Sequence, residues 1–519
     1  MPSSTPWTPS WTWILLTTLL TLPSCIQSKA VFAHFMLANT ENYTVSTWKT
    51  DIHAAKSSLI DAFALNTGHG MNHTTQSLND AFTAAEELDF KLFFSLDYSG
   101  AGPWPKNSVI ELLKRYTGRS AYFQHDGKPL VSTFEGFQHA GDWADIKSEV
   151  SSDVEGCCFF IPDWTSVGPR RATSSSSSSS SAAVPVIDGL MSWDAWPDGA
   201  NPMNTSEDLE YMSNLASRPY IMPVSPWFYT NLKQFNKNWV WRGDDLWYTR
   251  WQQVLEVQPE YVEILTWNDY GESHYIGPLR EEARGVFGQA GALFDYAEGM
   301  DHDGWRVLLP YLIGVYKGDI EEGEVEEEVL SVWYRLSPAG ACGDGGTMGN
   351  TESQNQVVLE AGEVLEDKVF YSAVLEGDAE VRVSIGGVNR SVEWTGVPEG
   401  GKGVYHGSVD MEDRTGQVVV TLSRDGEFLA QMKGRGIETS CGGNLTNWNA
   451  WVGNATAVSS KRRGGDGGGG GEESTSSISF SVQMWGGWIV IPFRLSVYQR
   501  PGAPSRNSTK HRSPGTQSR

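Results

Sequence analysis

Eight short apolar runs, separated by longer amphipathic stretches, occupy the N-terminal half of this sequence. Continuous apolar runs without alternating polar residues are typical of parallel strands that are buried on both faces of a sheet. The runs are residues 31–37, 60–65, 90–97, 129–135, 157–163, 189–196, 220–227 and 261–269. The stretches between them have the apolar spacing of helices. Five predicted helices are residues 48–58, 78–88, 108–116, 207–215 and 246–257.

This alternation of strands and helices predicts an α/β fold, specifically a (β/α)8 TIM barrel over residues 31–318. A doubly wound open sheet is the alternative, but no G-x-G-x-x-G motif follows the first apolar run. Residues 174–181 are all serine. Because such a run cannot build a core, we expect it to be an insertion in the loop after the fifth strand.

The sequence changes character after residue 318. Residues 319–457 contain short apolar segments bounded by Gly, Asp and Pro, which predict a β-sandwich-like accessory domain. We expect this domain to pack on the barrel and to assist an insoluble substrate, with a purely stabilising role as the alternative. Residues 458–477 are rich in Gly and Ser and are expected to form a linker. Residues 478–519 are expected to be a strand-like segment and a disordered tail.

Residues 1–30 are typical of a secretion signal. The apolar run from Trp11 to Leu22 is shorter than the roughly 18–20 residues that a membrane span needs, and small residues suited to cleavage follow it. Together with N-x-[ST] sites, this segment predicts a secreted, N-glycosylated monomer of the extracellular space or cell wall. The sites are Asn42, Asn72, Asn204, Asn389, Asn444, Asn454 and Asn507.

The net charge of the 519-residue chain is -24 and its pI is near 4.8. A surface this acidic repels nucleic acid and anionic membranes, so neither is expected as a partner. Secretion permits disulfides, and Cys342 with Cys441 could pair across the accessory domain. The adjacent Cys157 and Cys158 fit buried thiols at least as well as a bridge. No cysteine or histidine spacing indicates a metal site, so no metal or cofactor is expected.

Acidic residues follow most of the predicted strands at their carboxyl ends, where the active sites of such barrels form. A single acid there is explained as a helix cap or an ion-pair partner. Several acids held together raise one another's pKa values, which is the condition that a general acid needs near neutral pH. The acids are Asp97, Glu135, Asp163, Asp194, Asp269 and Glu272.

Residues 266–275, TWNDYGESHY, are the densest of these strand ends. Asp269 and Glu272 lie three residues apart, with aromatic and amide side chains between and around them. Glycoside hydrolysis needs two carboxyl groups, and aromatic rings suit the apolar faces of sugars. The plainer interpretation is a polar loop with two solvated acids.

Other polar or aromatic side chains near the strand ends are candidates for binding a sugar. They are His34, Asn66, Tyr98, Asp194, Trp227, Tyr229, Trp267, Asn268 and His274. His34 fits a hydrogen-bonded core histidine about as well. Trp239 and Trp241 are further candidates for stacking on a sugar, whereas Trp247 and Trp251 have helical spacing and are expected to pack in the core.

Several motifs, taken in order along residues 31–317, resemble glycoside hydrolase family 71, the fungal α-1,3-glucanases or mutanases. The motifs are VFAHFM at 31–36, DAFALN at 61–66, FSLD at 94–97, WDAW at 193–196, SPWF at 225–228 and TWNDYGES at 266–273. The resemblance implies a barrel fold, hydrolysis of α-1,3-glucan with inversion, and a catalytic set matching Asp97, Asp269 and Glu272.

The expected roles are Glu272 as general acid, Asp269 as general base and Asp97 as the residue that orients water or a substrate hydroxyl. Spacing along the chain does not fix these roles, and Asp97 with Glu272 could equally be the acid and base pair. Two other functions stay open. One is a barrel hydrolase acting on another polysaccharide such as mannan, and the other is a catalytically silent carbohydrate-binding protein.

Overall fold

The structure, a computed structural model, describes residues 29–71, 74–154, 156–174, 186–354 and 356–458. Three predicted features lie largely or wholly outside the described residues: the signal peptide, most of the serine run, and the linker and tail after residue 458. The N-x-[ST] sites at Asn72 and Asn507 lie outside them too. Within the described residues, no helix combines the length and the apolar character needed to cross a membrane.

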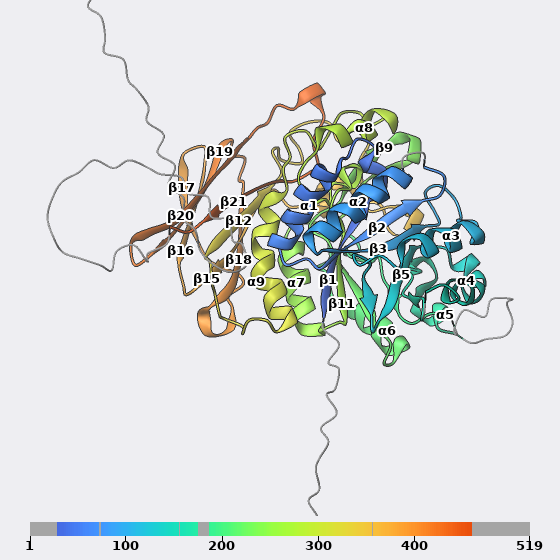
Figure 1. The fold of residues 1–519 in the computed structure, drawn as a ribbon. Coiled ribbons are helices and arrows are strands. Elements are labelled where there is room, and N and C mark those ends of the chain that lie inside the picture. The colour runs from blue at the N-terminus through green and yellow to red at the C-terminus, as the bar shows by residue number, and fades with distance from the viewer. Residues whose placement is uncertain (1–28, 72–73, 155, 175–185, 355, 459–519) are drawn as a thin grey trace, which may run out of the picture. The chain divides into compact units, whose positions relative to one another are not determined.

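A curled parallel sheet forms the framework of the N-terminal part (Figure 1). Its eight parallel strands are β1 (Ala30–Met36), β2 (Ala62–Gly68), β3 (Lys91–Asp97), β5 (Lys128–Phe134), β6 (Phe159–Phe160), β7 (Leu190–Met191), β8 (Tyr220–Val224) and β11 (Tyr261–Ile264). Each of these strands except β6 pairs with the next one along the chain, and β11 pairs with β1. After β6, an isolated parallel bridge joins Asp163 to Met191 in β7.

Each predicted apolar run overlaps one of these parallel strands, so the predicted α/β class is confirmed. The strand β2, for example, is buried along its whole length, as expected for a strand covered on both faces. The short hairpin strand β4 (Gln124–His125) pairs antiparallel with β5 at the edge of this sheet. Because all eight strands run in parallel, their carboxyl ends meet at one edge.

Helices cover the outside of the curled sheet (Figure 1). The five predicted helices are confirmed as α1 (Val45–Ser57), α2 (Thr74–Leu88), α3 (Lys106–Tyr116), α6 (Ser206–Leu215) and α7 (Leu246–Val257). In α1, the Thr44 side chain caps the first turn by accepting a hydrogen bond from the Thr47 amide. Trp48, Ile52 and Ala55 then repeat on one buried face. Further helices are α4 (Asp142–Ser151), α5 (Gly168–Ala172), α8 (Gly285–Gln289) and α9 (Leu309–Lys317).

Two four-stranded antiparallel sheets follow, in the orders β18-β15-β12-β21 and β17-β16-β19-β20. Their strands are β12 (Val329–Tyr334), β15 (Lys368–Leu375), β16 (Glu380–Ile385), β17 (Val388–Val392), β18 (Gly403–Asp410), β19 (Gly416–Arg424), β20 (Glu427–Ile437) and β21 (Trp451–Thr456). Side chains from both sheets share one buried cluster that includes Leu330, Tyr371, Val383 and Val420. Two disulfides are formed, Cys342–Cys441 and the adjacent pair Cys157–Cys158.

A third four-stranded sheet, in the order β14-β13-β10-β9, was not expected from the sequence. It joins a hairpin that follows β8, made of β9 (Tyr229–Leu232) and β10 (Lys237–Val240), to β13 (Met348–Gly349) and β14 (Leu359–Glu360). A short helix, α10 (Ala361–Val364), comes next. Strands of two to four residues are too short for the alternation of apolar and polar residues to be recognised in a sequence.

Buried contacts connect the chain before residue 318 to the chain after it. The indole N–H of Trp227 donates to the Trp448 carbonyl at 3.0 Å, and the indole N–H of Trp333 donates to the Asp244 carbonyl at 2.7 Å. His302 lies between the carbonyls of Tyr275 and Ala450, at 2.8 and 2.9 Å. One hydrophobic core therefore includes side chains from both segments.

Candidate active site

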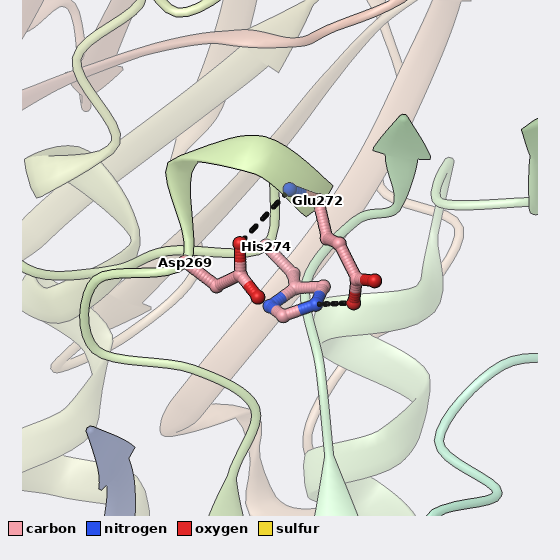
Figure 2. A group of neighbouring side chains, drawn as sticks. All are labelled: Asp269, Glu272 and His274. Atoms are coloured by element: carbon pink, nitrogen blue, oxygen red, sulfur yellow. Dashed lines mark hydrogen bonds and ion pairs between the residues drawn. The ribbon is translucent and has the colours of Figure 1, made fainter. Parts of the chain in front are cut away.

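The densest acidic segment of the sequence forms a tight turn after β11. Asp269 precedes the one-turn helix η5 (Tyr270–Glu272) and caps it, because its Oδ1 accepts a hydrogen bond of 3.1 Å from the Glu272 amide (Figure 2). The Thr266 hydroxyl in turn accepts from the Asp269 amide at 2.9 Å. These local hydrogen bonds fix both carboxylates at the carboxyl end of β11, as the sequence predicts.

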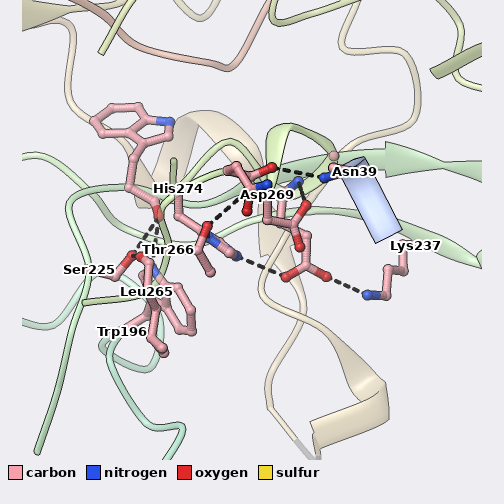
Figure 3. Close-up of polar contacts among 12 residues, drawn as sticks. Asn39, Trp196, Ser225, Lys237, Leu265, Thr266, Asp269 and His274 are labelled. Atoms are coloured by element: carbon pink, nitrogen blue, oxygen red, sulfur yellow. Dashed lines mark hydrogen bonds and ion pairs between the residues drawn. The ribbon is translucent and has the colours of Figure 1, made fainter. Parts of the chain in front are cut away.

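The His274 imidazole and the Lys237 ammonium each contact a different oxygen of the Glu272 carboxylate (Figures 2 and 3). Its Oε2 lies 2.9 Å from Nε2 of His274, which is itself fully buried and positioned by the Thr266 hydroxyl at 3.1 Å. Its Oε1 forms an ion pair with Lys237, which extends from β10. The sequence predicted His274 for this site, but it gave no signal for Lys237, which lies in the unpredicted hairpin.

The two acids have opposite electrostatic environments. Burial raises the pKa of Asp269, and the neighbouring Glu272 charge raises it further. Burial would also raise the pKa of Glu272, but the Lys237 ammonium and the His274 hydrogen bond together hold it well below its usual range. Where the pair shares one proton, these directions favour Asp269 over Glu272 as the residue that carries it.

Asp97 is the last residue of β3, at the same edge of the sheet. Its Oδ1 accepts hydrogen bonds of 2.8 Å from the amides of Ser99 and Gly100. A Cβ atom at Gly100 would lie 2.6 Å from Asp97 Oδ2, so a larger residue there would displace the Asp97 carboxylate. The pKa of Lys237 is raised chiefly by the charge of Glu272, and the charges of Asp269 and Asp97 raise it further. Of the three carboxylates, Glu272 is the one that forms an ion pair with this lysine.

One oxygen of Asp269 and one of Glu272 lie within 4.8 Å of each other and of a His274 ring nitrogen. This separation is shorter than the roughly 6.5–9.5 Å that an inverting acid and base need to admit water between them. The same three side chains are a group that could hold a metal ion. One Glu272 oxygen is already paired with the Lys237 ammonium, whose positive charge opposes a cation at that position.

Four of the predicted sugar-binding residues are buried and make contacts inside the protein, although Nε2 of His34 has no hydrogen-bond partner among the described residues. His34 is 0% exposed, and its Nδ1 lies 2.7 Å from Glu263 in the interior of the sheet. Asn268 exchanges hydrogen bonds with the backbone of Met36, at 2.7 and 3.2 Å. Trp227 donates to the Trp448 carbonyl, and Trp267 is buried beside Phe63. The sugar-binding role expected of these four residues stays a prediction.

The remaining predicted residues lie at or near the same edge. Asn66 lies within β2, and Tyr98 directly follows Asp97 at the end of β3. Both side chains are buried. Burial raises the pKa of Asp194 to about 6 and the pKa of Tyr229 to about 12. Tyr229 lies in β9 and its ring packs 4.7 Å from that of Tyr296. None of these four side chains bonds directly to the three carboxylates in the hydrogen bonds of the described residues.

Carboxylates gathered at the carboxyl edge of a parallel α/β sheet, with the pKa values of two neighbouring acids moved in opposite directions, are the chemical arrangement that glycoside hydrolases use. The sequence profile of glycosyl hydrolase family 71 matches residues 27–464, and the chain belongs to this family.

Proteins similar to this chain carry related names. A glucan endo-1,3-alpha-glucosidase of Schizosaccharomyces pombe is 34% identical over 85% of this chain and 97% of its own length. A mutanase of Penicillium rubens is 33% identical over 83% of this chain and 90% of its own length. Among solved structures, a GH99 endo-alpha-mannosidase from Bacteroides thetaiotaomicron covers 56% of this chain and 97% of that chain, with 11% identity and a TM-score of 0.42.

Proposed function

We propose that this protein hydrolyses the α-1,3-glucosidic linkages of α-glucan, as an endo-acting glucanase. The observation that carries the proposal is the turn that holds Asp269 and Glu272 together at the edge of the sheet where Asp97 also lies, in a chain of glycosyl hydrolase family 71. The names of the two relatives supply the substrate. Release of reducing sugar from α-1,3-glucan, with none from β-1,3-glucan or mannan, is the expected result. Release from mannan alone, or from no glycan, contradicts it.

The finer architecture is part of the proposal. We infer that the parallel sheet closes into a (β/α)8 barrel over residues 31–318. The pairing of β11 with β1 and the bridge from Asp163 to Met191 support closure, since they link all eight strands in a ring. We infer likewise that residues 319–457 form a β-sandwich, because two antiparallel sheets share one buried cluster.

We further propose that the protein is a secreted, N-glycosylated monomer of the extracellular space or cell wall, with residues 1–30 as its signal. The five N-x-[ST] asparagines among the described residues are all exposed, as attachment of a glycan requires. They are Asn42, Asn204, Asn389, Asn444 and Asn454. Treatment of the secreted protein with an N-glycosidase should lower its apparent mass.

Our proposed mechanism is a single displacement with inversion. Because oxygens of Asp269 and Glu272 lie within 4.8 Å of each other, closer than an inverting pair usually stands, we assign the base to Asp97 and the acid to the Asp269–Glu272 pair. Within the pair, the pKa directions favour Asp269 as proton donor and Glu272 as an ionised group that stabilises positive charge on the sugar. From the sequence we expected Glu272 to be the general acid and Asp269 the general base, whereas these pKa directions favour Asp269 as the proton donor.

Inversion predicts the configuration of the first product. Water attacks the anomeric carbon from the face opposite the leaving oxygen, so an α-linked substrate should first release a sugar of β configuration. Proton NMR of the anomeric region, recorded in the first minutes before mutarotation, measures this directly. An initial excess of the α-anomer would point to a covalent glycosyl-enzyme and would contradict the mechanism.

The Lys237→Met variant separates the two role assignments. Lys237 lowers the pKa of Glu272, so its removal should raise that pKa. If Glu272 works in its ionised form, a higher pKa removes the active form as pH falls. The acidic limb of the kcat/KM profile should therefore move to higher pH. Were Glu272 the proton donor, the alkaline limb would move up instead. Lys433→Met, which removes an exposed lysine on β20, is the control and should leave both limbs unchanged.

A further inference from the structure

We propose that a hollow beside the carboxylates, formed between β10 and the segment around β13, binds additional glucose units of the α-1,3-glucan chain. The proposal rests on the proposed function, because it names where the same substrate continues beyond the reacting linkage. The hollow has a volume of about 510 Å³, within the range of about 300–1,000 Å³ for ligand pockets. Its walls include Lys237, Asn238, Trp239, Met348, Asn350 and Glu352.

One side chain, Lys237, is shared between the hollow and the candidate active site. Lys237 lines the hollow, and its ammonium forms the ion pair with Glu272 (Figure 3). A glucan bound across the carboxylates therefore passes Lys237 when it extends toward β10. Because an endo-acting enzyme cleaves within a chain, it must hold sugar units on both sides of the reacting bond, and this hollow provides such a place.

Backbone pairing holds the two walls of the hollow together. β10 pairs in parallel with β13, with Trp239 opposite Met348 and Val240 opposite Gly349. The Thr347 hydroxyl donates to the Asn238 side chain at 2.9 Å, and the Asn350 amide donates to the Val240 carbonyl at 3.0 Å. A site that is held this firmly before binding loses little conformational entropy when a ligand enters.

The chemistry of the walls suits a neutral sugar. The exposed Lys233, Asn236 and Glu352 supply donors and acceptors for hydroxyl groups, and the Met348 thioether and the Trp239 indole supply apolar contact. The side-chain polar atoms of Asn238 and Asn350 are hydrogen-bonded within the wall, which they hold in place. The Trp239 ring is fixed by stacking on Phe228, with ring centres 5.7 Å apart, and by an edge contact with Trp241 at the same separation. Of the two tryptophans singled out in the sequence, Trp239 lines the hollow, whereas Trp241 donates its indole N–H to Gln356 at 2.8 Å.

This placement gives the C-terminal segment a part in substrate binding. Met348, Asn350 and Glu352 lie beyond residue 318, in the region that the sequence assigned to an accessory domain. The inference therefore predicts that substitutions in this segment weaken binding of longer glucans, although the segment contributes none of the three carboxylates.

The test measures binding in an Asp269→Asn background, which keeps the cap on η5 because asparagine retains an acceptor oxygen. Met348 is 39% exposed, so Met348→Arg fills the hollow without disturbing the core. By calorimetry with α-1,3-linked glucose oligomers of increasing length, this variant should bind the longer oligomers about tenfold more weakly, which corresponds to about 1.4 kcal/mol. Val388→Arg, a matched change at an exposed valine of β17, should bind like the parent.

Equal affinities of the Met348→Arg and Val388→Arg proteins for every oligomer would overturn the inference, as would a parent protein that gains no affinity with oligomer length. Trp239→Phe is a second, smaller change in the same wall, and it should also weaken the binding of the longer oligomers selectively. Failure of the proposed function has a different signature, because the wild-type protein would then release no reducing sugar from α-1,3-glucan.

Discussion

Asp269→Asn, Glu272→Gln and Asp97→Asn should each lower kcat on α-1,3-glucan by about 10²–10⁴-fold, the usual cost of losing a general acid or base or a charge that stabilises the transition state. Each change preserves the shape of the side chain and at least one acceptor oxygen. The cap that Asp269 forms on the Glu272 amide and the bonds from Ser99 and Gly100 to Asp97 can therefore persist. The loss should appear in turnover, measured as reducing sugar, and leave the melting temperature nearly unchanged.

Glu135→Gln is the matched control for these three variants. Glu135 also follows a strand of the parallel sheet, but its carboxylate bonds to the amide and hydroxyl of Ser166. Removing the charge of Glu135 should change turnover by no more than a few fold. Near-wild-type turnover in both Asp269→Asn and Glu272→Gln would contradict the assignment of the catalytic group.

The position of the proposed catalytic group at one edge of the sheet was predictable because it depends on a rule of topology. Parallel strands end at one edge, so acids that follow the strands in the sequence meet there. Asp97 and Asp269 are far apart in the chain, yet both lie at strand ends, and the charge of each raises the pKa of Lys237. The apolar runs were equally readable, because strands buried on both faces need uninterrupted apolar sequence.

The division of roles was not predictable, because it depends on Lys237. This lysine comes from a hairpin that has no alternating pattern of its own, and its ion pair with Glu272 reverses the effect of burial on that acid. Burial also determined which polar strand-end residues are accessible. A sequence does not distinguish His34, paired with Glu263 inside the sheet, from a histidine that faces a substrate.

The boundary between the predicted domains was read from a change in composition, but composition does not report contacts. Trp333 and Trp448 are typical of a hydrophobic core in either domain. In the structure, they pack with side chains from before residue 318, as part of one buried cluster. The pairing of β10 with β13 likewise joins the two predicted domains, at the hollow proposed to bind glucan.

Deleting the chain after Lys317 should therefore give a protein that aggregates, which favours the stabilising role of the C-terminal region. The deletion removes the carbonyl partners of Trp227 and His302, and it exposes the apolar surface around Trp305 that packs near Trp333. Fully burying one large apolar side chain contributes about 1.5–3 kcal/mol. Exposing several of them removes an amount comparable with the whole stability of a domain, about 5–15 kcal/mol.

Size-exclusion chromatography and circular dichroism of the protein ending at residue 317 measure this outcome, beside a control that ends at residue 458 and retains every contact among the described residues. The control should elute as a folded protein and cleave α-1,3-glucan. A soluble, folded protein ending at residue 317 that still cleaves long oligosaccharides at the control rate would contradict both the stabilising role and the contribution of the β13 segment to binding. If that protein stayed folded but lost activity only on the longer oligosaccharides, its core would be independent of the C-terminal region, and the missing wall of the hollow would account for the loss.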